Sequence, residues 1–142
     1  GTKRASTYAK HLGVDMAICY KQRKVANQVE NMTVIGDVKG KNVVIVDDMC
    51  DTAGTLTKAA DLMMEHSALS VRAICTHPVL SGPAYERIAN SSLQELIVTD
   101  SIPLRTDVDT SKITVLPVHD MFAQTLRCLM ANKSISSQFT LQ

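Results

Sequence analysis

Residues 42–55, NVVIVDDMCDTAGT, constrain the fold of this chain more than any other stretch. The apolar, β-branched run 43–46 predicts a strand that is buried on both faces. Two carboxylates, Asp47 and Asp48, stand where that strand is expected to end. After a loop of small residues, apolar side chains recur with the spacing of an amphipathic helix over residues 55–66. A strand, an acidic pair, a loop and a helix in this order are the layout of a ligand site.

The loop at residues 51–55 has the properties that a phosphate group requires. Its small side chains let backbone N–H groups converge, and the N-terminal end of the following helix adds a favourable dipole. Thr52 and Thr55 can add hydroxyl donors. Asp47 and Asp48 are acceptors that can bind neighbouring hydroxyls of a sugar or hold a divalent cation. A sugar phosphate would satisfy both halves, but a simple helix cap after a solvated acidic pair would produce the same pattern.

Composition limits the class of protein. The chain has 142 residues, of which 45% are hydrophobic and 4% aromatic, which suits one α/β domain with an aliphatic core. A net charge of +1 and few aromatic residues argue against a nucleic-acid partner. The sequence has no signal peptide, lipid-anchor motif or apolar run of membrane length. We therefore expect no membrane association and a cytoplasmic location.

The cysteines have neither metal-site nor redox-motif spacing, which predicts reduced thiols in a reducing compartment. They are Cys19, Cys50, Cys75 and Cys128. Cys50 lies in the candidate loop, but the neighbouring carboxylates of Asp48 and Asp51 disfavour a thiolate. We therefore do not expect Cys50 to be a nucleophile.

The N-terminal residues predict a helix that opens at residue 2 and ends at Gly13. In an α/β fold, a helix start that follows a glycine usually comes after a strand and can bind an anion. We therefore expect that the first strand of the fold is missing from this chain. An ordinary terminus is the alternative reading.

The remaining apolar runs predict strands at 16–20, 32–35, 71–76, 96–98 and 113–116. Helices are expected after residue 83 and from about residue 119, and the apolar stripe of the second is expected to lie in the core or at an interface. The whole pattern predicts a three-layer α/β domain whose mostly parallel sheet is covered on both faces.

A basic segment at residues 21–29, KQRKVANQV, follows the first of these strands and fits a mobile loop. Lys21 and Arg23 are of the kind that neutralises transferring phosphates, although such a run is more often a solvated face.

The stretch VVIVDDMCDTAGT resembles the 5-phosphoribosyl 1-diphosphate (PRPP) binding motif of the type I phosphoribosyltransferase fold. In that family the acidic pair binds the ribose hydroxyls, and the loop holds the ribose 5-phosphate. The resemblance implies that the sugar is bound by Asp47 and Asp48 and the phosphate by Asp51, Thr52, Ala53, Gly54 and Thr55. Asp47 and Asp48 are also the candidate metal ligands.

Over its whole length the chain is more similar to the ribose-phosphate diphosphokinase (PRPP synthetase) family. The segments that carry this resemblance are GTKRA, residues 21–55, THPVLSGPAYERI and SISSQF. The resemblance implies that residues 1–142 are the C-terminal domain of such an enzyme. It implies that Lys21 and Arg23 are catalytic residues of a flexible loop, and that Thr2, Lys3 and Arg4 contact diphosphate or ATP. The implied reaction transfers the diphosphoryl group of ATP to the C1 hydroxyl of ribose 5-phosphate, with Mg²⁺, to give PRPP and AMP.

The same resemblance implies a homo-oligomer, a hexamer, of chains about twice this length. Residues 134–142 are expected to be a flexible tail, or to supply a regulatory anion site from Ser134, Ser136 and Ser137. The 142-residue chain alone is expected to bind ribose 5-phosphate weakly and to have little or no synthetase activity. The alternatives are a phosphoribosyltransferase that consumes PRPP and a non-catalytic regulatory relative, and the intact Lys21 and Arg23 argue against the second.

Overall fold

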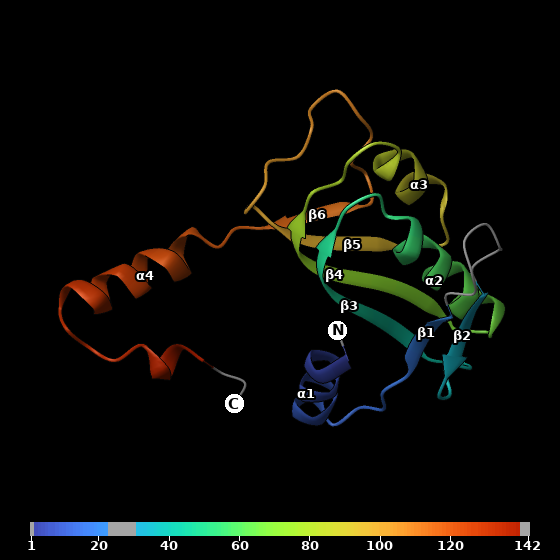
Figure 1. The fold of residues 1–142 in the computed structure, drawn as a ribbon, viewed down its shortest axis with the longest axis horizontal. Helices are drawn as coiled ribbons and strands as arrows, with labels where there is room; N and C mark the ends of the chain where they lie inside the picture. The colour runs from blue at the N-terminus through green and yellow to red at the C-terminus, as the bar shows by residue number, and fades with distance from the viewer. Residues whose placement is uncertain (1, 23–30, 140–142) are drawn as a thin grey trace.

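A computed structural model describes residues 2–22 and 31–139 of the chain (Figure 1). In chain order the elements are α1 (Thr2–Leu12), β1 (Ile18–Gln22), β2 (Asn31–Ile35), β3 (Asn42–Cys50), α2 (Gly54–Glu65), β4 (Ser70–Pro78), α3 (Ala84–Asn90), β5 (Glu95–Thr99), β6 (Ile113–Leu116), α4 (His119–Met130) and the 3₁₀ turn η1 (Ser136–Gln138).

A four-stranded parallel sheet with the strand order β3-β4-β5-β6 is the centre of the fold. β3 and β4 pair in register from Asn42 opposite Ser70 to Cys50 opposite Pro78. Strands β1 and β2 form a separate antiparallel pair. Because the four main strands run in the same direction, their carboxyl ends, with the loops that follow, meet at one edge of the sheet.

The core lies between this sheet and helices α2 and α3, which lie on the same face of it (Figure 1). Alternate residues of β4 point into that core, so that Val71, Ala73 and Cys75 are buried while Ile74 is exposed. Leu96 of β5 and Ile88 of α3 are among the largest fully buried side chains. The mostly parallel α/β sheet predicted from the sequence is thus confirmed.

The other face of the sheet is open within the described residues. Val44, Ile74 and Leu116 lie on it and are 52%, 43% and 54% exposed. The expectation of a sheet covered on both faces is therefore met on one face only in this part of the chain. The apolar strands encode two apolar faces, but neither α1 nor α4 has a buried residue and neither forms the second layer.

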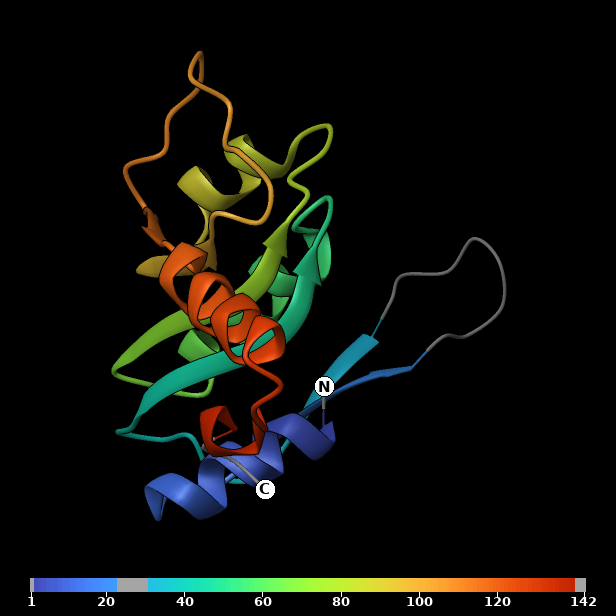
Figure 2. The ribbon, with the colours of Figure 1, turned by 90° about the vertical axis from the view of Figure 1, so that its left-hand side faces the viewer.

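Most predicted elements lie where the sequence placed them, but one differs in a way that matters. β3 continues to Cys50, so the acidic pair lies inside the strand and does not follow it. The apolar stripe of α4 is not in the core, because Phe122 and Leu126 are 58% and 59% exposed. Figures 1 and 2 show α4 and η1 standing beside the sheet rather than within its layers.

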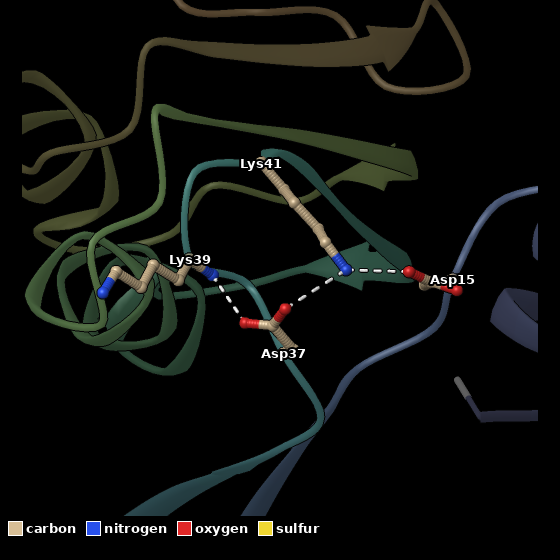
Figure 3. A network of polar contacts seen from close by, with 4 residues as sticks. All are labelled: Asp15, Asp37, Lys39 and Lys41. Atoms are coloured by element: carbon tan, nitrogen blue, oxygen red, sulfur yellow. Dashed lines mark hydrogen bonds and ion pairs between the residues drawn. The ribbon is translucent and has the colours of Figure 1, made fainter.

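Lys41 ties the segment after α1 to the start of β3 (Figure 3). Its Nζ lies 2.7 Å from Oδ2 of Asp15 and 3.5 Å from Oδ2 of Asp37. The backbone N–H of Lys39 donates to Oδ1 of Asp37 at 3.0 Å, which fixes the turn between β2 and β3. The hydrogen bond and the charge of Lys41 lower the pKa of Asp15, and Asp15 in turn raises the pKa of Lys41.

Replacing Lys41 by Met is expected to raise the pKa of Asp15 towards its ordinary value, as followed by NMR titration of the carboxyl group. The lowered pKa means that Asp15 adds stability above its unfolded-state pKa and loses it as the pH falls through the folded-state value. Removing Lys41 should therefore weaken the pH dependence of stability in this acidic range. Lys39→Met is the control, since only the backbone of Lys39 takes part; an unchanged Asp15 pKa in Lys41→Met would contradict the pairing.

Candidate functional site

The candidate loop lies at the edge of the sheet where β3 ends, and the segment that follows β4 lies beside it. The N–H of Leu80 donates to the carbonyl of Cys50 at 3.0 Å, and the N–H of Ser81 donates to the carbonyl of Asp51 at 3.1 Å. The Ser81 hydroxyl also donates to Oδ1 of Asp51. The segment after β4 therefore holds both the backbone and the side chain at the start of the loop.

The next two loop carbonyls are also held. Nη1 of Arg87, in α3, donates to the carbonyl of Thr52 at 2.9 Å. The N–H and Oγ1 of Thr57, in α2, donate to the carbonyl of Ala53 at 2.9 and 3.0 Å. With the two bonds from the segment after β4, four successive carbonyl oxygens of residues 50–53 accept hydrogen bonds within the chain.

The N–H groups of the loop, unlike its carbonyls, have few partners in the described part of the chain. Within residues 2–22 and 31–139, no oxygen accepts a hydrogen bond from the N–H of Asp51, Thr52, Gly54 or Thr55. The C=O and N–H of a trans peptide point in opposite directions, so holding the carbonyls also fixes the directions of the N–H groups. Free N–H donors beside the N-terminal end of a helix, here the 12-residue helix α2, are an arrangement suited to an anion such as a phosphate.

Ala53 is the residue at which the loop turns into α2, and it has the left-handed backbone conformation with φ of 57°. This conformation costs a residue with a side chain about 1–2 kcal/mol. Such strain persists only where the surrounding contacts determine the conformation, and it is common at functional sites. Ala53 is also buried, so its methyl group faces the core and leaves the outer side of the loop open.

The acidic pair lies in β3 next to this loop, and both side chains are exposed. The N–H of Asp48 donates to Oδ1 of Asp47 at 2.9 Å, and Nη1 of Arg4 lies 3.4 Å from Oδ2 of Asp48. Hydrogen bonding with Asp47 and the nearby guanidinium lower the pKa of Asp48, which favours its ionised form. The structure thus brings the beginning of α1 against the acidic pair, while the contact of Arg4 with diphosphate or ATP stays a prediction.

The structure describes some, but not all, of the other residues that were predicted to be catalytic or to contact ATP. Thr2 and Lys3 are exposed in the first turn of α1. The backbone of Lys21 lies in β1, opposite Met32. Arg23 lies outside the described residues, so the roles of Lys21 and Arg23 remain predictions.

The serines of the proposed regulatory site lie after α4. Oγ of Ser134 lies 2.6 Å from Oγ of Ser136, and the N–H of Ser136 also donates to Oγ of Ser134. Ser137 is exposed in η1. Figures 1 and 2 place this segment away from the candidate loop. Their regulatory role stays a prediction.

The sequence analysis missed Ser81 and Arg87 as loop contacts. Their position near the loop could have been predicted in part. Neighbouring parallel strands end at the same edge of a sheet, so the segment after β4 must pass close to the segment after β3. His77, also near the end of β4, has Nδ1 3.0 Å from Oγ of Ser101, which fits the structural hydrogen-bonding role that a lone His usually has.

The described part of the chain contains neither a metal-binding cluster nor a membrane-spanning helix. No cluster of three or more His, Cys, Asp or Glu that could hold a metal ion occurs in residues 2–22 and 31–139. The acidic pair therefore offers at most two carboxylates. No helix of this described part has both the length and the apolar character that crossing a bilayer requires.

Cys50 is the last residue of β3, directly before the candidate loop, and it is 5% exposed. A hydrogen bond with Cys75, burial and the negative charge of Asp47 raise the pKa of the Cys50 thiol. These effects agree with the expectation from the sequence that Cys50 is not a nucleophile.

We expect Cys50 to resist iodoacetamide at neutral pH in the folded chain, because both burial and the raised pKa keep the thiolate scarce. Cys128, which is partly exposed, should react faster and serves as the internal control. Peptide mass spectrometry after a short exposure would measure both. Labelling of Cys50 at the rate of Cys128 would contradict this description.

Comparison with known proteins places this geometry in a family. The model of the family described as "Phosphoribosyl synthetase-associated domain" matches residues 21–140. The chain belongs to this family. The match includes the acidic pair, the loop and Arg87, and it begins at Lys21.

Relatives of this phosphoribosyl synthetase-associated domain carry consistent names. The chain is 50% identical over 139 residues to a ribose-phosphate pyrophosphokinase of Porphyromonas gingivalis and 52% identical over 139 residues to one of Campylobacter jejuni. Each alignment covers 98% of this chain but 44% of the relative, so the chain spans less than half the length of these proteins. Ribose-phosphate pyrophosphokinase is another name for PRPP synthetase. The similarity to this family that the sequence indicated is thereby confirmed.

A solved structure agrees. The chain superimposes on the phosphoribosylpyrophosphate synthetase from Mycobacterium smegmatis with a TM-score of 0.83 and 37% sequence identity, over 92% of this chain and 42% of that one. The phosphoribosyl synthetase-associated domain therefore has the type I phosphoribosyltransferase-like fold that the sequence predicted.

Proposed function

We propose that this chain is the ribose 5-phosphate binding domain of a ribose-phosphate pyrophosphokinase. As part of the whole protein, it would help to transfer the diphosphoryl group of ATP to the C1 hydroxyl of ribose 5-phosphate, giving PRPP and AMP. The observation that carries the proposal is the loop at 51–55, whose carbonyls are held within the chain while its N–H groups have no protein acceptor in the described part. The names of the relatives support the same reaction.

In this proposal the loop binds the 5-phosphate, and the acidic pair binds the ribose. The N–H groups of Thr52, Gly54 and Thr55 and the end of α2 would donate to the phosphate oxygens. Asp47 and Asp48, both exposed and next to the loop, would accept hydrogen bonds from the ribose hydroxyls. Two contacts on one rigid strand and one on the adjoining loop would orient the sugar for in-line attack on the β-phosphorus.

ATP and magnesium would complete the reaction. Mg²⁺ commonly takes one or two carboxylates together with substrate phosphates, so the exposed oxygens of Asp47 and Asp48 suit it without a larger cluster. When bound, Mg²⁺ would neutralise the charge of the polyphosphate. Arg4, which already lies beside Asp48, is suited to contact diphosphate, and Lys21 and Arg23 would stabilise charge on the transferring group.

Location and assembly are further parts of the proposal. All four cysteines are free thiols, which suits the reducing cytoplasm. The exposed apolar stripe of α4, together with the open face of the sheet, supports a homo-oligomer such as the hexamer implied by the resemblance. The relatives' names do not favour a PRPP-consuming transferase or a regulatory relative.

Calorimetric titration with ribose 5-phosphate tests the binding site. We expect the chain to bind this sugar phosphate weakly and the variant Asp51→Ala, Thr52→Ala to bind it at least about tenfold more weakly, because charge-assisted contacts at the loop are lost. The matched control is Asp109→Ala, Thr110→Ala, which removes the same pair of residue types from the loop before β6. Equal binding by both double variants would contradict the proposed site.

A second expectation concerns activity. The 142-residue chain alone should show little or no conversion of ATP and ribose 5-phosphate into PRPP and AMP, because it spans 44% of the relatives that carry the name of the enzyme. Chromatographic measurement of AMP formation would test this. Turnover at the rate of a full-length relative assayed in parallel would contradict it.

A further inference from the structure

Arg87 is the one side chain from α3 that reaches the candidate loop in the described structure. Its Nη1 donates to the carbonyl of Thr52 at 2.9 Å, across 35 positions of sequence. Its guanidinium also lies over Gly54, where an added Cβ would be 3.1 Å from Nη1 and 3.7 Å from Cζ. Gly54 does not have a positive φ, so the effect of a side chain at this position would be to crowd the Arg87 guanidinium.

The contact is made at the point where the loop most needs support. Thr52 precedes Ala53, whose left-handed conformation is strained. The peptide between these two residues is planar, so the bond from Arg87 to its carbonyl fixes the orientation of the whole peptide group. The N–H of this peptide group is that of Ala53, and its orientation constrains the two adjoining peptide groups, which carry the N–H groups of Thr52 and Gly54.

The rest of the Arg87 side chain makes it a suitable residue to change. It is exposed, and it borders a hollow of about 360 Å³ between α2 and α3 whose other lining residues include Asp61 and Glu86. The buried residues of α3 are Ala84, Tyr85 and Ile88, so the helix is anchored in the core without Arg87. Removing its charge leaves the core packing intact.

We propose that Arg87 is a positioning residue for the phosphate loop: it holds the peptide between Thr52 and Ala53 in place and does not itself contact the substrate. The inference rests on the proposed function for the identity of the ligand, but the effect on the loop does not need the ligand. Arg87→Met should therefore change the loop in the free chain and weaken ribose 5-phosphate binding in the same variant.

The first measurement is hydrogen exchange in the free chain, followed at the N–H groups that donate to the loop carbonyls. These belong to Thr57, Leu80 and Ser81. Arg87→Met is expected to speed their exchange by about tenfold, since local opening becomes easier once a charge-assisted hydrogen bond is lost. Arg127→Met, which removes an exposed arginine from α4, is the control and should leave these rates unchanged. Unchanged exchange in Arg87→Met would overturn the proposal.

The second measurement is calorimetry with ribose 5-phosphate on Arg87→Met, Gly54→Ala and the double variant. Arg87→Met should bind ribose 5-phosphate about tenfold more weakly. The loss should be the same at low and high salt, because salt screens the attraction between distant charges but does not change how a hydrogen bond orients a peptide group. Gly54→Ala should also bind more weakly because its Cβ displaces the guanidinium. The double variant should bind no worse than Arg87→Met alone, because the two changes break the same contact.

Additive losses in the double variant, or a loss that disappears at high salt, would show that Arg87 acts as a distant charge and would overturn the proposal. Failure of the proposed function would give a different set of results. In that case the unaltered chain would not bind ribose 5-phosphate, while faster exchange in Arg87→Met would still support the positioning role.

Discussion

β3 and β4 pair in parallel from Asn42 opposite Ser70 to Cys50 opposite Pro78, and the position of the candidate loop and of the residues that hold it depends on this pairing. Parallel strands in register end together, so the chain leaving β3 and the chain leaving β4 emerge side by side. The segment after β4 can then donate to the carbonyls of Cys50 and Asp51. Without this pairing, the loop and the residues that hold it would be unrelated stretches of sequence.

The loop shows how a protein can hold a strained backbone in place with hydrogen bonds to its carbonyls. Each hydrogen bond to a loop carbonyl contributes about 1 kcal/mol, and several together offset the cost of about 1–2 kcal/mol for the left-handed Ala53. The same bonds turn the N–H groups away from the protein. In the proposed function, the contacts that hold the strained loop are therefore also the contacts that would prepare it to bind an anion, and the exposed acidic pair would take the sugar.

The secondary structure was largely predictable, and the exceptions have physical reasons. The strand at 113–116 and the helix that opens at residue 2 have the predicted positions, because periodicity and a terminating glycine define them locally. β3 runs past its predicted end because a strand's backbone ladder does not exclude carboxylates whose side chains face solvent. The second layer could not be predicted, because apolar residues show that a face needs covering but do not show which segment covers it.

The loop composition, the acidic pair before it and the parallel α/β class could be read from the sequence, since each is encoded by neighbouring residues. Which distant residues meet at the loop depends on the folded chain. Arg4 reaches Asp48, and Ser81 and Arg87 reach the loop, across 30 or more positions of sequence. Such contacts are fixed by strand order and helix placement. In the sequence, Arg87 cannot be distinguished from an ordinary solvated side chain, and only the fold brings it against Thr52.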